Sequence, residues 1–151
     1  MLRWGVVMSQ IVESSQMLDA ETLTKELQHF CGTEQYFKHS FGLRYTEGVA
    51  YLAKNAECYW LIDAIASHQF EAKVLRNLRL KEFQLWMLNV GDSHEFIKPA
   101  AGNAAVLTCW EDTPKPESKP AIIQQTPFTD FPLSEIKLYL QDKVLLFPSE
   151  N

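Results

Sequence analysis

Residues 135–147 read EIKLYLQDKVLLF, and this stretch decides the fold class. Apolar and polar residues alternate in its first half, so Ile136, Leu138 and Leu140 fall on one face of an extended chain. Asp142 marks a tight turn, after which the apolar run KVLLF returns as a partner strand. An alternating segment followed by a tight turn and a short apolar run predicts an antiparallel β-hairpin.

Three further strands are predicted before this hairpin. The segments EFQLWMLNV (82–90), AAVLTCWE (104–111) and AIIQQTPF (121–128) are short, rich in β-branched or aromatic residues, and bounded by polar segments. A Gly-containing loop (91–103) and a Pro- and charge-rich loop (113–120) join them. The five segments together predict an antiparallel sheet of four or five strands.

Helical spacing dominates the first half of the chain. Asp19 is typical of an N-cap, and Gly32 lies where a helix beginning there would end. Thr46 is typical of a second N-cap, before EGVAYLAKN. The longest helix is predicted over 57–76, whereas 32–45 has no clean period and is predicted as a loop with one helical turn.

Helices that precede a run of strands indicate an α+β fold, with the N-terminal helices packed on one face of the sheet. The length of 151 residues is that of a single domain, predicted here over 19–151. Residues 1–18 carry little periodic signal and are predicted to be a poorly ordered extension. Met8 is a plausible true start within that extension.

Composition excludes several classes of protein. The net charge is −5, and the one basic cluster (Lys73, Arg76, Arg79 and Lys81) is short, so direct nucleic-acid binding is not expected. Three widely spaced cysteines do not form a disulfide framework and favour the cytoplasm. Without an apolar run of ~20 residues, no membrane span is expected. Common nucleotide-binding, metalloprotease and hydrolase motifs do not occur, so we expect neither metal nor cofactor.

The helix predicted over 57–76 places two titratable residues among apolar ones. At about 100° per residue, Asp63 and His68 leave the helix on different sides and cannot pair with each other. Tyr59 and Trp60 lie beside Asp63, whereas aliphatic residues surround His68. Since the helix is apolar around most of its circumference, it is predicted to be central and packed on several sides. His68 is then a core histidine with one backbone partner.

Asp63 has two interpretations. A carboxylate among aromatic rings costs several kcal/mol to bury unless donors satisfy it. In the first interpretation, which we favour, Asp63 accepts hydrogen bonds from a Tyr hydroxyl, a Trp indole or the backbone N–H groups of a loop, and it holds that loop in place; the loop 33–39 is the natural donor in either interpretation. In the second, Asp63 lines an aromatic pocket and acts as an acid or base. The candidate catalytic residues are Glu34, His39 and Asp63, and the candidate binding residues are Gln35, Tyr36, Tyr59 and Trp60.

Two functions follow from these features. The first is a small non-enzymatic binding or protein-interaction domain that presents one face of its sheet to an unknown protein partner or to a second copy as a homodimer. The residues considered for that face are Trp86, Trp110, Lys137, Tyr139 and Gln141. The alternative is a small enzyme, with Asp63 or Glu34 as general base and His39 as acid or orienting group.

Five segments in a fixed order resemble a family of small bacterial proteins classed only as a domain of unknown function. They are CGTEQYFKH (31–39), LRYTEGVAYLA (43–53), YWLIDAIASHQ (59–69), FQLWML (83–88) and PFTDFPLSEIKLYL (127–140). The resemblance runs from Cys31 to the C-terminus, and the first thirty residues and the insertion at 113–120 depart from it. It implies a bacterial cytoplasmic protein, linked to mobile genetic elements, and supplies no activity, cofactor or site residue.

Overall fold

The structure is a computed structural model that describes residues 17–151. The predicted extension (1–18) and the alternative start at Met8 therefore lie outside the described residues, apart from positions 17 and 18. Leu18 is tied to the domain, because its backbone N–H donates to the carbonyl of Asn55 at 2.8 Å.

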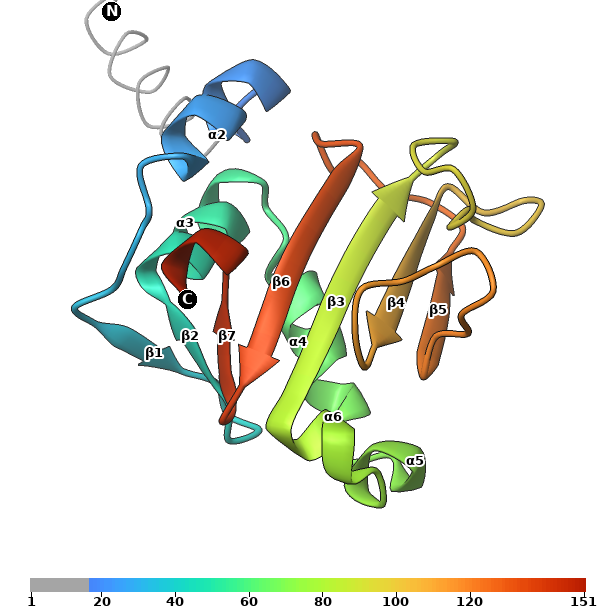
Figure 1. Cartoon of the computed structure of the whole chain (residues 1–151). Coiled ribbons are helices and arrows are strands. Elements are labelled where there is room, and N and C mark those ends of the chain that lie inside the picture. Colours follow the sequence, from blue (N-terminus) through green and yellow to red (C-terminus); the bar gives the residue numbers. More distant parts are fainter. Residues whose placement is uncertain (1–16) are drawn as a thin grey trace, which may run out of the picture.

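The described chain forms an α+β fold around one sheet of seven strands, shown in Figure 1. The order across the sheet is β1-β2-β7-β6-β3-β4-β5, and every neighbouring pair is antiparallel except β2 and β7, which are parallel. The strands are β1 (Tyr36–Lys38), β2 (Arg44–Thr46), β3 (Phe83–Val90), β4 (Ala105–Trp110), β5 (Ile122–Thr126), β6 (Glu135–Gln141) and β7 (Val144–Leu146).

The prediction of four or five antiparallel strands was too low. The five predicted segments all form strands, and the extra two, β1 and β2, come from the segment 32–45 that was predicted as a loop. All three residues of β1 are exposed, so no burial pattern marks that strand in the sequence. β2 is held on its other side by parallel pairing with β7, about 100 residues along the chain, which local sequence does not encode.

Five α-helices and one 3₁₀ turn complete the described fold. They are α2 (Ala20–Leu27), α3 (Glu47–Asn55), α4 (Tyr59–His68), α5 (Ala72–Leu75), α6 (Leu78–Glu82) and η1 (Pro148–Glu150). The two predicted N-caps are confirmed: the Asp19 carboxylate accepts from the backbone N–H of Thr22, and the Thr46 hydroxyl accepts from that of Val49. No helix among the described residues is long and apolar enough to span a bilayer.

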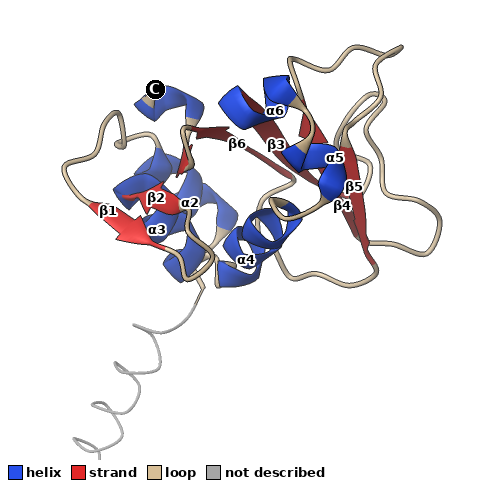
Figure 2. Ribbon diagram, turned by 90° about the horizontal axis from the view of Figure 1, so that it is seen from below, coloured by secondary structure: helices blue, strands red, loops and turns tan. Residues whose placement is uncertain are grey.

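The single helix predicted over 57–76 was wrong, because the chain turns after His68. Residue Glu71 has an extended backbone (φ −71°, ψ 140°), and a short α5 and α6 follow in place of a continued helix. Polar side chains stabilise the turn: Gln69 donates back to the carbonyl of Ile65, and the His68 ring contacts the Glu71 carboxylate. Figure 2 shows α4, α5 and α6 as separate helices.

Two apolar clusters use opposite faces of the sheet. The larger joins residues of α2, α3 and α4, including Leu23, Val49 and Ile65, to strand residues such as Trp86 and Leu138. Figure 1 shows α4 behind β6 and β3. The smaller cluster holds alternate residues of β3 and β4 against the loop that follows β3; its buried members are Leu85, Met87, Ile97, Val106 and Trp110.

These clusters correct the expectation of an open sheet face for partners. Trp86 is buried in the larger cluster and Trp110 in the smaller one, so neither indole is at the surface. Tyr139 packs on the smaller cluster and stacks edge-on against Phe83. The 91–103 loop packs on this face through Phe96 and Ile97, whereas Lys137 is exposed and Gln141 is half-buried.

The C-terminal turn is joined to the start of α3 by one carboxylate. Glu150 Oε1 accepts from the hydroxyl of Thr46 at 2.8 Å and from the backbone N–H of Phe147 at 2.9 Å. Glu150 Oε2 is buried and has no partner among the described residues. Gly48 leaves the space for this carboxylate, because an added Cβ would lie 2.9 Å from both of its oxygens.

The three cysteines differ in accessibility, which predicts their reactivity. Cys58 and Cys109 are buried, and burial raises the pKa of each thiol to about 12, whereas Cys31 is exposed. Since the thiolate is the reactive form, we expect Ellman's reagent at pH 8 to modify one thiol per folded chain rapidly and the other two only after unfolding. The variant Cys31→Ser should show no rapid phase; a rapid phase that persists in it would contradict this assignment.

Candidate functional site

The structure brings together two of the three candidate catalytic residues. His39, in the turn between β1 and β2, places Nε2 2.7 Å from Oδ1 of Asp63 on α4. The His39 side chain is 12% exposed and that of Asp63 is 67% exposed. The helix face that carries Asp63 also carries exposed Tyr59 and Ser67, so the prediction of a helix packed on several sides with a buried carboxylate was wrong.

The second nitrogen of His39 is also occupied. Nδ1 accepts from the backbone N–H of Phe41 at 3.0 Å, which makes Nε2–H the donor to Asp63 in the neutral ring. Further hydrogen bonds between His39 and Leu43 and between Gly42 and His39 close the turn, and Gly42 adopts φ +100° as the turn requires. Because both ring nitrogens have partners, the His39–Asp63 pair fixes the turn that presents Phe41.

The other candidate residues lie apart from this pair. Glu34 and Gln35 are exposed before β1, and Tyr36 is exposed on β1, where the guanidinium of Arg44 lies 5.3 Å from its ring centre. Tyr59 is exposed at the start of α4, whereas Trp60 is half-buried and packs against the larger core cluster. No contact between Glu34 and Asp63 occurs in the described structure, so the expected three-residue constellation reduces to His39 and Asp63.

A groove beside the same turn was not expected from the sequence. Its volume is about 420 Å³, and it runs between the β1–β2 turn and the helices α5 and α6. The apolar residues that line it are Phe41, Leu43, Phe70, Val74, Leu75, Leu80 and Leu140. Phe41 and Phe70 meet edge-on at its margin, with ring centres 5.7 Å apart. None of the seven candidate residues is among its lining residues, although His39 stacks edge-on against Phe41.

Several large apolar side chains at the groove are exposed to solvent. Phe41 is 53% exposed, Phe70 63% and Leu75 52%, and the adjacent Leu78 is 76% exposed. Single exposed apolar residues are ordinary, but a cluster of them around a concavity is typical of a binding surface. The apolar residues of this cluster that follow His68, Phe70 and Leu75, were predicted to lie on two different sides of one helix over 57–76, so the sequence did not bring them together.

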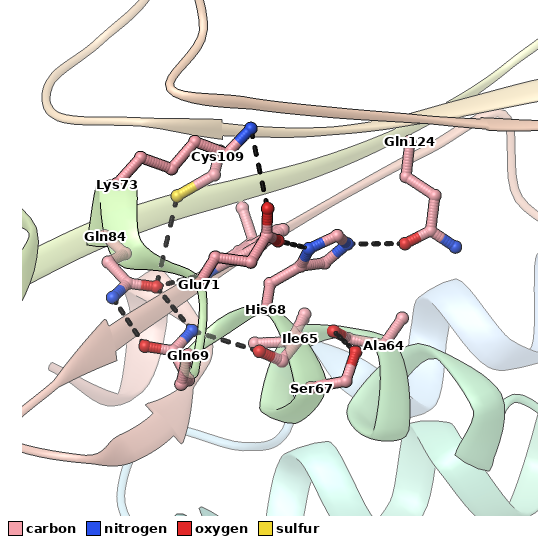
Figure 3. Close-up of polar contacts among 11 residues, drawn as sticks. Ala64, Ile65, Ser67, His68, Gln69, Glu71, Lys73, Gln84, Cys109 and Gln124 are labelled. Carbon is pink, nitrogen blue, oxygen red and sulfur yellow. Dashed lines mark hydrogen bonds and ion pairs between the residues drawn. The ribbon is translucent and has the colours of Figure 1, made fainter. Parts of the chain in front are cut away.

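Gln69 and Gln84 line the groove, and the N–H groups of their side-chain amides already have hydrogen-bond partners. Gln84 Nε2 donates to Oε1 of Gln69 and to the carbonyl of Leu80, and Gln69 Nε2 donates to Oε1 of Gln84 and to the carbonyl of Ile65. Gln84 Oε1 also accepts from the indole N–H of Trp86 at 2.8 Å. Figure 3 shows this pair of amides, with the sulfur of Cys109 nearby. All four amide N–H groups thus have partners within the protein.

His68 lies behind this pair and anchors the turn between α4 and α5. Its Nδ1 contacts Glu71 and its Nε2 lies 2.6 Å from Oε1 of Gln124 on β5, as Figure 3 shows. Its ring also stacks on Trp86, with centres 5.7 Å apart. The expectation of one backbone partner was therefore wrong: both partners are side chains, one of them 56 residues away in sequence.

The contact between His68 and Glu71 predicts a pH dependence of stability. The hydrogen bond from His68 lowers the pKa of the Glu71 carboxyl below its ordinary value of 4.5. A carboxyl with a lowered pKa in the folded state adds stability above its unfolded pKa, and this contribution is lost as the pH falls through the folded value. In urea unfolding, the stability difference between wild type and Glu71→Gln should be largest near neutral pH and shrink below about pH 4.5. A difference that grows in acid would contradict the assignment.

Cations surround the groove, and they differ in their partners. Lys81 and Lys143 line it, and neither forms an ion pair with any residue in 17–151. Among the other residues of the basic cluster, Lys73 pairs with Glu71 and Arg79 with Glu111, whereas Arg76 forms no ion pair among residues 17–151. Lys81 and Lys143 are thus two of several lysine and arginine side chains in residues 17–151 that form no ion pair, and they are the two that line the groove. Elsewhere in the described chain, no three His, Cys, Asp or Glu side chains gather where they would hold a metal ion.

The fold and the groove define a mixed α+β domain with a mostly antiparallel sheet and an open apolar concavity beside one end of α4. The chain belongs to a family of unknown function, DUF6876, whose model matches residues 21–151. This result confirms the resemblance to an uncharacterised domain and extends it toward the N-terminus by ten residues. No significant match to the chain was found among curated proteins or among solved structures.

Proposed function

We propose that this protein is a small non-enzymatic binding domain and that the groove between the β1–β2 turn and α5–α6 is its binding site. The observation that carries the proposal is the cluster of exposed apolar side chains, Phe41, Phe70 and Leu75, around a concavity of about 420 Å³. Sites for small ligands are mostly apolar concavities of ~300–1,000 Å³ with a few polar groups. The volume and lining of this groove agree with that description.

The His39–Asp63 pair contributes to the proposed site by positioning Phe41. Phe41 belongs to a turn in which the backbone N–H groups of His39, Phe41 and Gly42 and both nitrogens of the histidine ring are hydrogen-bonded, and Gly42 adopts a conformation that other residues rarely adopt. A pre-formed wall reduces the entropy lost on binding. The pair therefore acts on ligand affinity through Phe41, not by contact with the ligand.

The test uses a neutral apolar dye, N-phenyl-1-naphthylamine, in a fluorescence titration. Wild type should bind the dye, and Leu75→Asp should lower its affinity roughly tenfold, since it removes a partly buried leucine side chain and adds a charge to the groove. Leu78→Asp is the matched control: it has the same chemistry on the next helix, and Leu78 does not line the groove. It should change the affinity by less than about twofold.

Both aspartate variants replace exposed residues, so they should fold, and circular dichroism will check this. Phe70→Asp provides a second groove variant of the same kind. If wild type does not bind the dye, or if Leu75→Asp and Leu78→Asp weaken binding equally, the groove is not a specific binding site and the proposal is wrong.

Self-association is the competing use of the same surface. Two copies related by a twofold axis could bury Leu78 together with Phe70 and Leu75, because all three are exposed within nine residues of sequence, in the α4–α5 turn, in α5 and in α6. Light scattering separates the two uses. A dimer that both Leu75→Asp and Leu78→Asp dissociate would assign the surface to a second copy, in place of a ligand.

A catalytic role is the second candidate, and the 2.7 Å contact between His39 and Asp63 is the observation that favours it. A general base needs one free ring nitrogen, however, and Nδ1 already accepts from Phe41. An enzyme would hydrolyse p-nitrophenyl acetate or phosphate above background and lose this activity in His39→Ala and Asp63→Ala. A positioning pair would show no such turnover, and amide exchange at Phe41 would accelerate roughly fivefold in His39→Ala, corresponding to one lost hydrogen bond.

We further propose a location in the cytoplasm. The support is chemical: all three cysteines are free, and two of them are buried as thiols. Such a pattern suits a reducing compartment.

A further inference from the structure

We propose that the ligand of this groove is a free single-chain amphiphile with an anionic head group, held tail-inward and with its head at Lys81 and Lys143. This inference rests on the function proposed above and names the ligand class. It follows from two features of the site: the groove offers the ligand no free amide N–H, and its cations lack acidic partners.

The interior of the groove accepts only an apolar group. The polar side chains that line it, apart from the two lysines, are Gln69 and Gln84. Their four amide N–H groups bond to each other and to the carbonyls of Ile65 and Leu80. A ligand group that accepts hydrogen bonds would lose those it makes to water and find no free amide donor in return, which lowers its affinity. An alkyl chain loses nothing and covers Phe70, Val74 and Leu75.

The rim supplies the complementary charge. Lys81 belongs to α6 and Lys143 lies in the β6–β7 turn with φ +64°, so two elements far apart in sequence each contribute an exposed lysine to the lining of the groove. Their sequence neighbours Glu82 and Asp142 form no ion pair with either lysine among residues 17–151. In a chain of net charge −5, two unpaired cations beside an apolar groove favour an anionic head over a cationic or neutral one.

The experiment compares decanoate with decanol. Both are about ten carbons long, but the head group of decanoate is a charged carboxylate and that of decanol is a neutral hydroxyl. Affinities are measured by displacement of N-phenyl-1-naphthylamine at low ionic strength and below the micellar concentration. The affinity for decanoate should fall about fivefold in the double variant Lys81→Gln/Lys143→Gln, because two exposed ion pairs, each of small contribution, are removed. Decanol should bind the double variant and wild type equally.

The matched control is Lys54→Gln/Lys119→Gln, which makes the same change in net charge at exposed lysines that do not line the groove. It should leave decanoate affinity unchanged. Added salt should weaken decanoate in wild type and have little effect in Lys81→Gln/Lys143→Gln.

The outcomes separate this inference from the proposed function. If the affinity for decanoate falls equally in both double variants, or in neither, the ligand is not an anionic amphiphile. The groove would then remain a binding site for decanol and the dye. If neither decanoate nor decanol displaces the dye, the amphiphile is excluded. If the dye itself does not bind, both this inference and the proposed function are wrong.

Discussion

Replacement of Trp86 by alanine should lower the free energy of unfolding by about 3–5 kcal/mol. Trp86 is 1% exposed at the centre of the larger cluster, and its loss would leave a cavity that the rigid sheet cannot close. It would also leave Gln84 Oε1 without the indole donor and the His68 ring without its stacking partner. Urea unfolding followed by circular dichroism measures the change.

Two further variants make this result interpretable. Trp86→Phe keeps one aromatic ring, removes the indole N–H and leaves a smaller cavity than alanine does, so it should cost about 1–3 kcal/mol and remain measurable if the alanine variant does not fold. Phe128→Ala removes an aromatic ring that is largely exposed and should cost less than about 0.5 kcal/mol. A loss below about 1 kcal/mol for Trp86→Ala would mean that the packing around this residue is not as described.

The second large effect is expected at Gly48, where alanine should lower the stability of the protein, in contrast to its usual effect in a helix. Alanine in place of a helical glycine ordinarily stabilises by up to about 1 kcal/mol. Here the added Cβ would meet both carboxylate oxygens of Glu150 at 2.9 Å and displace a group that accepts from Thr46 and Phe147. Gly48→Ala should therefore destabilise the protein by about 1–3 kcal/mol, as should Glu150→Ala.

A double-mutant cycle tests the contact directly. Once Glu150→Ala has removed the carboxylate, the added methyl group at position 48 meets no obstacle, so Gly48→Ala should become neutral or stabilising in that background. Gly32→Ala is the control, because nothing lies within 4 Å of its added Cβ. Strictly additive effects of Gly48→Ala and Glu150→Ala would show that the two residues do not interact.

The candidate site shows where prediction from the sequence ended. The pairing of the 33–39 loop with Asp63 was our favoured interpretation, and the structure places His39 within hydrogen-bond distance of that carboxylate. The groove was not predicted, because its walls come from the β1–β2 turn, the α4–α6 segment and the β6–β7 turn. Residues such as Leu43 and Leu140 are ordinary core residues in sequence. Their common concavity exists only after the chain folds.

The sequence by itself determined the features that depend on neighbouring residues. Alternation in 135–147 specified β6 and β7, the caps at Asp19 and Thr46 specified two helix starts, and five ordered segments identified the family. The tertiary structure decided the parallel pairing of β2 with β7, the turn after His68 and the exposure of Asp63. The reason is physical: periods and caps act within a few residues, whereas pairing, burial and concavity are set by groups far apart in sequence.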